Sequence, residues 1–130
     1  MEISEALIRR VDTYKAPSKA LASIKDIPLL FMVGITGAGK DTLLNQLAST
    51  YPDKYAFTVS YTTRPPRTND GVVERDGVEY HFIDVATAER MINEGEYLET
   101  NHYAGNIYGT SIEDIARLDV PAKLSSKMWM

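Results

Sequence analysis

The first apolar residues of the chain recur at helical spacing, with charged residues between them. These positions are Ile3, Leu7, Val11 and Tyr14. Their spacing predicts an amphipathic helix over residues 2 to 14, which Pro17 is expected to end. The polar stretch that follows, up to Ile27, is expected to be a linker. We interpret this arm as a packing or tethering segment and assign it no chemistry.

An unbroken apolar run lies between Leu29 and Val33, and a glycine cluster follows it directly. Such runs are typical of strands that are covered on both faces. Residues 40 to 49 then place three leucines on one face of a helix, namely Leu43, Leu44 and Leu47. The pattern therefore predicts a buried strand, a glycine loop and a helix in succession.

The middle of the chain is rich in β-branched and aromatic residues. Residues 57 to 62 and 79 to 83 have this composition, and the stretch from 71 to 77 between them has turn chemistry. These segments predict a β-rich insert after the helix.

A helix, a strand and a second helix are expected further on. The first helix covers residues 86 to 93 and is closed by Gly95. The strand includes Tyr97, Leu98 and Tyr103. Thr110 and Glu113 are spaced as a capping box, so the second helix is expected to begin there. After Val120 the pattern predicts no element.

Composition narrows the class of protein. The 130 residues are 44% apolar and 25% charged, which is typical of one globular domain. A formal net charge of −4 argues against binding to nucleic acid or to anionic membranes, because both rely on basic surfaces. The longest apolar run is far shorter than the roughly 20 residues that cross a bilayer. Cysteine is absent, which fits a reducing compartment, so we expect a cytoplasmic protein.

A candidate phosphate-binding loop follows the apolar run, with the sequence Gly34-Ile35-Thr36-Gly37-Ala38-Gly39-Lys40. Its glycines and lysine have the spacing of this motif. Glycines let backbone N–H groups turn towards a phosphate chain, the next helix presents its positive end, and Lys40 can reach the outer phosphates. The alternative is a glycine-rich turn with a surface lysine, but the flanking strand and helix favour the phosphate site.

One position departs from the motif. The residue after the lysine is usually Ser or Thr, whose hydroxyl ligates magnesium, whereas here it is Asp41 followed by Thr42. A carboxylate is a competent magnesium ligand and is favoured at a helix N-terminus, yet it adds negative charge beside a triphosphate. Asp41 is therefore a candidate Mg²⁺ ligand. Alternatively, it caps the helix while Thr42 supplies the hydroxyl.

A second candidate phosphate site is the segment Ser60-Tyr61-Thr62-Thr63-Arg64-Pro65-Pro66-Arg67. Arginine offers a planar fork of donors that matches phosphate oxygens, and proline reduces the entropy lost when the segment is ordered. Arg64 and Arg67 therefore form a candidate phosphate clamp. Taken alone, the same segment is equally consistent with a solvated basic turn.

Three further blocks follow in a fixed order: Gly77-Val78-Glu79-Tyr80-His81-Phe82, Gly95-Glu96-Tyr97-Leu98-Glu99 and Gly105-Asn106-Ile107-Tyr108-Gly109-Thr110. Together with the phosphate loop they resemble guanylate kinase over about residues 29 to 115. The resemblance implies an α/β fold, the P-loop nucleoside-monophosphate-kinase fold, with a parallel core sheet, flanking helices and a β-rich GMP-binding insert. It also implies a transfer of phosphate from ATP to GMP with Mg²⁺.

The resemblance assigns roles to individual residues. ATP phosphates are expected at Gly34, Gly37, Ala38, Gly39, Lys40, Asp41 and Thr42, with Lys40 as the catalytic residue. GMP is expected at Ser60, Arg64, Arg67, Tyr80, Glu99, Tyr108 and Thr110. The arginines and tyrosines can donate hydrogen bonds to the monophosphate. Glu99 can accept from the ring N–H and amine of guanine, whereas adenine lacks that pair of donors. As single residues the tyrosines would be read as core and Glu99 as surface. His81 and His102 have no metal-ligand spacing and are expected to be structural or surface residues.

The C-terminal part of this fold is expected to be missing. We divide the chain into a helical extension and linker (1–27), a guanylate-kinase-like domain (28–118) and an atypical tail (119–130). The tail has neither the acidic strand nor the lid arginines that the resemblance implies. A truncated or frameshifted frame, a split protein, a fragment and a binding remnant all remain open. An unpaired edge beside Leu29–Val33 would invite self-association.

Two other functions compete with the kinase. The first is a non-catalytic binding module like the guanylate-kinase-like domains of scaffold proteins, which tend to lose the phosphate loop that Gly34, Gly39 and Lys40 retain here. The second is a kinase for AMP or a deoxynucleotide, against which the group of Glu99, Tyr108 and Thr110 argues. Guanylate kinase therefore remains the leading hypothesis.

Overall fold

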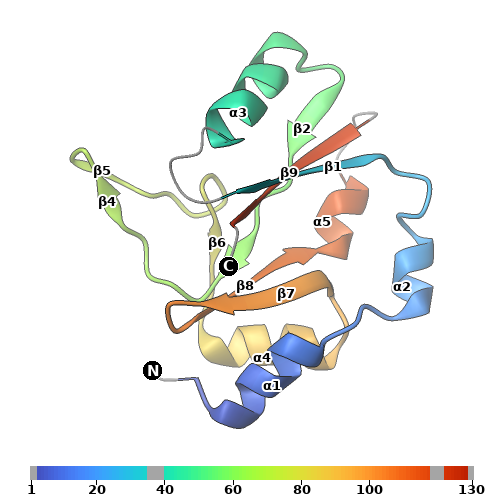
Figure 1. Ribbon diagram of the computed structural model, residues 1–130, viewed down its shortest axis with the longest axis vertical. Coiled ribbons are helices and arrows are strands. Elements are labelled where there is room, and N and C mark those ends of the chain that lie inside the picture. Colours follow the sequence, from blue (N-terminus) through green and yellow to red (C-terminus); the bar gives the residue numbers. More distant parts are fainter. Residues whose placement is uncertain (1–2, 35–39, 118–121, 129–130) are drawn as a thin grey trace.

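The computed structural model describes residues 3–34, 40–117 and 122–128. A parallel sheet has the strand order β1-β9-β2 (Figure 1). Its strands are β1 (Leu29–Gly34), β2 (Tyr55–Phe57) and β9 (Ala122–Met128). Helix α3 (Lys40–Thr50) lies over this sheet. The helix expected over residues 40 to 49 is confirmed; of its leucines, Leu44 is fully buried and Leu43 is 47% exposed.

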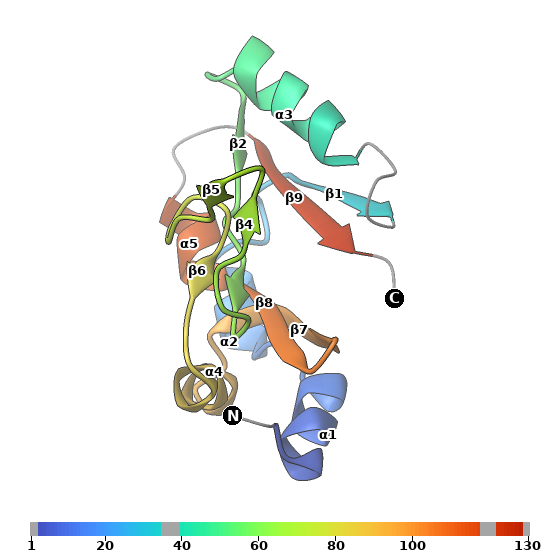
Figure 2. The same ribbon diagram turned by 90° about the vertical axis from the view of Figure 1, so that its left-hand side faces the viewer.

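A second sheet has the order β6-β3-β8-β7 and lies below the first (Figure 2). Its strands are β3 (Tyr61–Thr62), β6 (His81–Phe82), β7 (Tyr97–Tyr103) and β8 (Asn106–Ser111). Strands β7 and β8 form an antiparallel hairpin whose turn residues, Ala104 and Gly105, have φ of 49° and 80°. The β-rich insert is therefore present, although the expected strand over residues 57 to 62 is split between β2 and β3.

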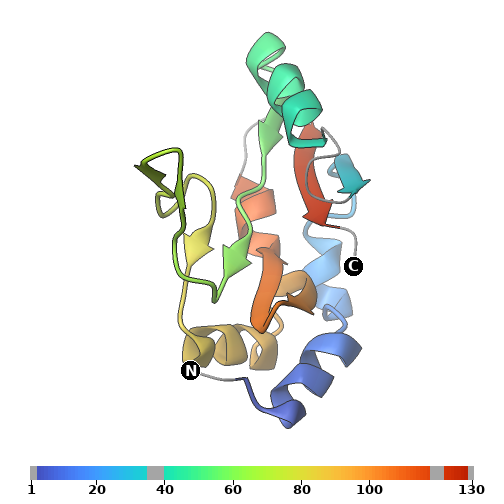
Figure 3. The same cartoon turned by 60° about the vertical axis from the view of Figure 1, so that its left-hand side comes forward.

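A small hairpin projects from the body of the molecule (Figure 3). It consists of β4 (Thr68–Asn69) and β5 (Val72–Val73). Its turn residues, Asp70 and Gly71, have φ of 51° and 79°. Asp-Gly is a preferred pair for a two-residue hairpin turn, because both positions require left-handed backbone. The expected turn chemistry of this stretch is thus confirmed.

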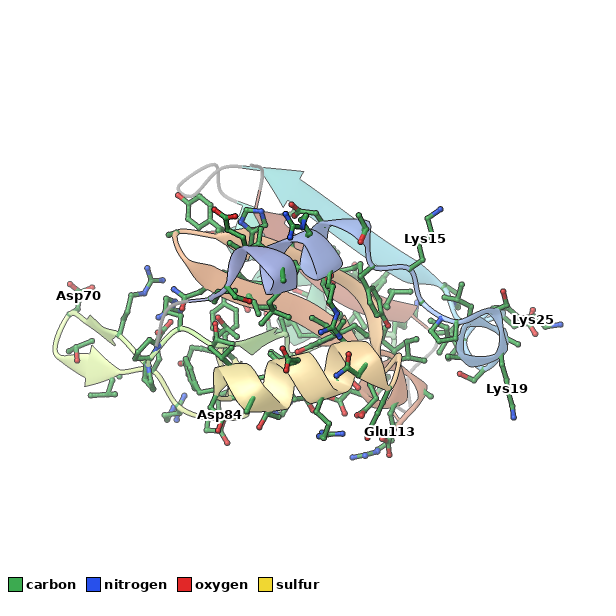
Figure 4. The ribbon with its side chains drawn as sticks, turned by 90° about the horizontal axis from the view of Figure 1, so that it is seen from below. Lys15, Lys19, Lys25, Asp70, Asp84 and Glu113 are labelled. Atoms are coloured by element: carbon green, nitrogen blue, oxygen red, sulfur yellow. The ribbon has the colours of Figure 1, made fainter. Side chains whose placement is uncertain are left out.

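Two helices pack on the second sheet and close the larger core. Helix α1 (Glu5–Thr13) is capped by Ser4, which accepts from the Leu7 amide, and α4 (Val85–Asn93) is capped by Asp84 (Figure 4). Their apolar faces meet β7 and β8 in one cluster of buried residues: Leu7, Val11, Ala88, Met91, Ile92, Tyr97 and Ile107. The helices expected over residues 2 to 14 and 86 to 93 are therefore confirmed.

Three expectations from the sequence were wrong. The supposed linker contains helix α2 (Ser18–Ala22). The stretch after Val120, for which no element was expected, forms β9 in the middle of the first sheet, so β1 is paired on that side. Helix α5 (Ile112–Arg117) is capped by Ser111, whose hydroxyl accepts from the Asp114 amide at 3.3 Å, and not by Thr110. Within the described ranges, no helix has the length and apolar character needed to cross a membrane.

Candidate functional site

The predicted phosphate loop connects the first strand to the first helix of the core. Gly34 is the last residue of β1, and Lys40 is the first of α3. Asp41 and Thr42 occupy the first turn of that helix. The remaining loop residues, 35 to 39, which include the predicted Gly37, Ala38 and Gly39, lie outside the described residues. The structure thus bears out the strand and helix that the motif requires.

Magnesium is the metal that the resemblance implies for this loop. In the described part of the chain, no group of three or more histidine or acidic side chains is gathered for a metal ion. Asp41 and Thr42 offer a carboxylate and a hydroxyl oxygen, which are ligands that Mg²⁺ accepts. Because Mg²⁺ usually takes only one or two protein ligands together with substrate phosphates, this donor set fits the ion.

Arg64 is held in place by an acidic residue that the sequence analysis did not single out, Glu74. The Arg64 Nη1 atom donates to Glu74 Oε1 at 2.8 Å, and Nη2 donates to Oε2 at 3.3 Å. The two side chains are only 12% and 7% exposed. The hydrogen bond raises the pKa of Arg64, and the same bond lowers the pKa of Glu74. Both groups are therefore charged at neutral pH.

Two predicted tyrosines surround this arginine. The Arg64 Cζ atom lies 5.2 Å from the ring centroid of Tyr80 and 6.0 Å from that of Phe82. The ring centroids of Tyr80 and Tyr108 are 5.9 Å apart, and the ring planes meet at 63°. Burial is the main cause that raises the pKa of Tyr80, so its hydroxyl stays protonated and can donate. Arg64, Tyr80 and Tyr108 thus form one cluster of donors.

The second predicted arginine lies at the rim of this cluster. The Arg67 side chain is 63% exposed, and its Nε atom is 3.8 Å from Glu74 Oε1. Its backbone amide donates to the same oxygen at 2.8 Å. Arg67 therefore has a fixed backbone and a side chain that is open to solvent.

Glu99 and Thr110 form a second polar group on the adjoining strands. They are partners across the β7–β8 pair, and Thr110 Oγ1 donates to Glu99 Oε1 at 2.7 Å. A register shift between Tyr97 and Glu99 sets this pairing, because two residues of β7 advance against one of β8. Thr110 is 1% exposed, whereas Glu99 is half-buried.

Gly109 permits the close approach of these strands. A Cβ atom there would lie 2.5 Å from the Tyr97 ring and 3.0 Å from the Glu99 carbonyl oxygen. Such contacts are too short for any side chain at this position. The glycine therefore belongs to the architecture of the site.

Ser60 lies at the end of the same sheet. Its carbonyl oxygen accepts from the His81 amide at 2.9 Å. Tyr61, the next residue, pairs antiparallel with Gly109. Continuing that register sets Ser60 beside Thr110. The predicted residues of the insert thus follow β8 from Tyr108 to Thr110 and the strands on either side of it.

The side chains of both histidines contact aspartates. His81 Nε2 lies 3.6 Å from Asp114 Oδ2, and His102 Nε2 lies 3.0 Å from Asp12 Oδ1. Tyr61 stacks on His81 with ring centroids 4.5 Å apart, and burial raises the pKa of Tyr61 to about 12. These contacts agree with the expectation that both histidines are structural or surface residues.

Glu74 is the main residue of the site that the sequence analysis missed, but the sequence did carry a signal for it. The Asp-Gly turn pairs Thr68 with Val73, so Arg67 and Glu74 are the next facing pair. The Glu74 amide indeed donates to the Arg67 carbonyl at 2.8 Å. Extending the register of a predicted hairpin would have placed a carboxylate beside the arginines.

Comparison with known proteins shows which family the chain resembles. A family model described as guanylate kinase matches residues 27–124. Guanylate kinase 1 of Oryza sativa subsp. japonica is 48% identical over 82 residues, which are 63% of this chain and 20% of that protein. Guanylate kinase of Schizosaccharomyces pombe is 38% identical over 103 residues, which are 79% of this chain and 48% of that protein.

Two further likenesses complete the comparison. MAGUK p55 subfamily member 2 of Rattus norvegicus is 41% identical over 86 residues, 66% of this chain and 15% of that protein. The crystal structure of guanylate kinase from Anaplasma phagocytophilum shares the fold, with a TM-score of 0.50, 22% identity, and coverage of 80% of this chain and 50% of that one. The chain therefore spans half or less of the length of these relatives. On the family model and these identities, the chain belongs to the guanylate kinase family.

Proposed function

We propose that this chain is the nucleotide-binding part of a guanylate kinase, which catalyses ATP + GMP to ADP + GDP. In this reaction an oxygen of the GMP phosphate bonds to the γ-phosphorus of ATP while the bond from that phosphorus to ADP breaks. The observation that carries the proposal is that two clusters of polar side chains lie next to each other along strand β8. A donor cluster at Arg64, Tyr80 and Tyr108 adjoins an acceptor pair at Glu99 and Thr110.

The donor cluster suits the phosphate of GMP. Arg64 and Arg67 contribute charge-assisted N–H donors, and the phenol groups of Tyr80 and Tyr108 add neutral ones. Lys15, Lys19 and Lys25 lie at the opposite end of the molecule from Asp70 in the β4–β5 hairpin, which directly follows the two arginines (Figure 4). Phosphate binding therefore rests on the local cluster, as the negative net charge requires.

The acceptor pair suits guanine. Guanine presents a ring N–H and an exocyclic amine side by side, and a carboxylate at Glu99 accepts from both. Thr110 already donates to one of its oxygens, which orients the group. Thr110 and Ser60 can in addition serve the carbonyl edge of the base. Adenine lacks these two donors. AMP would therefore remove Glu99 from water without offering new hydrogen bonds to its carboxylate, which costs binding free energy.

The phosphate loop suits ATP. Backbone amides of residues 34 to 39 and the Lys40 ammonium would hold the phosphates, and Asp41 and Thr42 would hold Mg²⁺. The ion, when bound, neutralises charge on the transferred group. A non-catalytic binding module would share the GMP site but would not need this loop. The retention of Gly34, Gly39 and Lys40 in the sequence favours the enzyme.

Calorimetric titration of the folded chain with GMP and AMP tests the proposal. We expect GMP to bind about tenfold more tightly than AMP. Leaving one buried polar group unmatched costs about 1 to 3 kcal/mol, and roughly 1.4 kcal/mol corresponds to a tenfold change in the dissociation constant. Glu99→Gln should remove most of this preference, while His102→Gln, a surface control on the same strand, should keep it. Equal affinity for both nucleotides, or no binding by either, would contradict the proposal.

We further propose that the protein is cytoplasmic. We also propose that two copies of the chain associate through strand β1. Among the described strands, β1 is last in the order β1-β9-β2, so its outer edge has no partner within this sheet. Such edges invite pairing with another chain. Sedimentation velocity at increasing protein concentration should show a dimer, and a monomer throughout would exclude this association.

A further inference from the structure

Glu74 accepts hydrogen bonds from two parts of the arginine segment, the Arg64 side chain and the Arg67 backbone. Its carboxylate accepts from Arg64 Nη1 and Nη2, and its Oε1 atom also accepts from the Arg67 backbone amide. The Glu74 amide returns a bond to the Arg67 carbonyl oxygen. One residue thus ties the buried guanidinium, the backbone of the second arginine and the hairpin together.

Burial explains why Arg64 needs such a partner. A buried charge without a counterion is strongly unfavourable, so an unpaired arginine would turn out to solvent. At 12% exposure the Arg64 side chain remains inside, beside Tyr80, and the 7% exposed Glu74 carboxylate neutralises it there. The guanidinium is therefore held in the donor cluster before any ligand arrives.

The bonding pattern leaves the arginine able to bind a ligand as well. An arginine carries five N–H donors. Bonds to the Pro65 carbonyl and to the two Glu74 oxygens engage three of them. The remaining hydrogen bonds of Arg64 are with the hydroxyls of Tyr108 and Tyr80. The carboxylate thus fixes the plane of the fork, and a phosphate oxygen would replace a neutral hydroxyl as the partner of the remaining N–H groups.

We infer that Glu74 is a positioning residue for the phosphate of the bound nucleotide, acting through Arg64. It does not touch the ligand. It holds the guanidinium beside Tyr80 and Tyr108, so that the ordering of a long side chain is completed before binding and does not weaken it. This inference rests on the proposed binding of GMP at the cluster.

A double-mutant cycle tests the inference. GMP and guanosine are titrated into the 130-residue chain and into the variants Glu74→Gln, Arg64→Ala and the double variant. Glu79→Gln is the matched control. Its carboxylate lies in the same loop and also accepts from a backbone amide, that of Arg75, but it does not contact Arg64.

We expect Glu74→Gln to raise the GMP dissociation constant by up to about tenfold, because the long Arg64 side chain would then have to be ordered when GMP binds. Guanosine affinity should stay unchanged, and the Glu79→Gln control should bind both ligands like the original chain. In the Arg64→Ala background the Glu74 substitution should have no further effect, because its action passes through that arginine. A merely structural role would weaken guanosine too and would persist without Arg64.

Each contrary result has a definite meaning. GMP binding by Glu74→Gln that equals or exceeds that of the original chain would overturn the inference alone and would show that Glu74 competes with phosphate. An equal loss in the Arg64→Ala background would also overturn it. Failure of the folded original chain to bind GMP would overturn the proposed function and the inference together. If Glu74→Gln does not fold, Glu74→Asp, which keeps the charge but shortens the reach, takes its place with the same expectations.

Discussion

At the scale of single residues, the two arginines of the clamp differ in what they hold. Arg64 is buried and compensates the charge of Glu74, whereas Arg67 is exposed, with a backbone bond to Glu74 and only a long ion pair, 3.8 Å, from its side chain. Both are proposed to contact the phosphate of GMP. Only Arg64 therefore contributes to the fold as well as to the ligand site.

Replacing each arginine separates these roles. Arg64→Ala and Arg67→Ala should each weaken GMP binding by roughly 1.5 to 3 kcal/mol and hardly affect guanosine. Arg64→Ala should also lower the free energy of unfolding by about 1 to 3 kcal/mol because it leaves Glu74 without its partner, while Arg67→Ala should change it by less than about 0.5 kcal/mol. Titration calorimetry and urea unfolding measure the two effects. Equal losses for GMP and guanosine would mean that the arginines hold only the fold.

At the scale of elements, helix α1 belongs to the core that supports the site. Leu7 and Val11 pack in the same cluster as Tyr97 and Ile107, and the Tyr14 hydroxyl donates to the Tyr97 carbonyl oxygen. Helix α1 therefore packs against β7, the strand that carries Glu99 of the acceptor pair. The N-terminal arm contributes to the packing of this sheet.

Truncating one buried side chain of α1 tests this contribution. Leu7→Ala should lower the free energy of unfolding by about 2 to 5 kcal/mol, because Leu7 is 3% exposed and its loss leaves a cavity. Arg9→Ala, on the solvent side of the same helix, should have an effect within about 0.5 kcal/mol. Denaturant unfolding of both variants decides the matter. A small effect of Leu7→Ala would show that α1 is only a tether.

At the scale of the whole molecule, the central strand of the first sheet carries no acidic residue. Strand β9 occupies that position, and its sequence, Ala-Lys-Leu-Ser-Ser-Lys-Met, contains no Asp or Glu. The family resemblance implies an acidic residue near the metal on such a strand, and arginines on a lid. The match to the family ends at residue 124.

We therefore expect the isolated 130-residue chain to transfer phosphate very slowly or not at all, even where GMP binds. Charged groups that neutralise the transferred phosphoryl contribute large factors, about 10³ to 10⁵ for one arginine finger. A coupled assay for ADP release at saturating GMP and Mg-ATP measures the rate, with Lys40→Ala as the control for a contaminating kinase. Turnover on the order of 1 to 100 per second that this control abolishes would contradict the expectation.

Local patterns in the sequence accounted for the elements that depend on neighbouring residues. The helical spacing and caps of α1 and α4, and the Asp-Gly turn of the β4–β5 hairpin, act over a few positions, so they can be read along the chain. The glycine and lysine spacing of the phosphate loop, and the ordered blocks after it, are local in the same sense. From them the family and the candidate residues of the site were predicted.

Contacts between distant segments decided the remainder. The unpatterned segment Ala122–Met128 became a strand because parallel pairing with β1 and β2 satisfies its backbone groups. The bulge that pairs Glu99 with Thr110 depends on the register of two strands. The burial of Arg64 against Glu74 depends on the fold of the hairpin. Such features follow from packing and pairing free energies summed over the molecule, so no short stretch of sequence contains them.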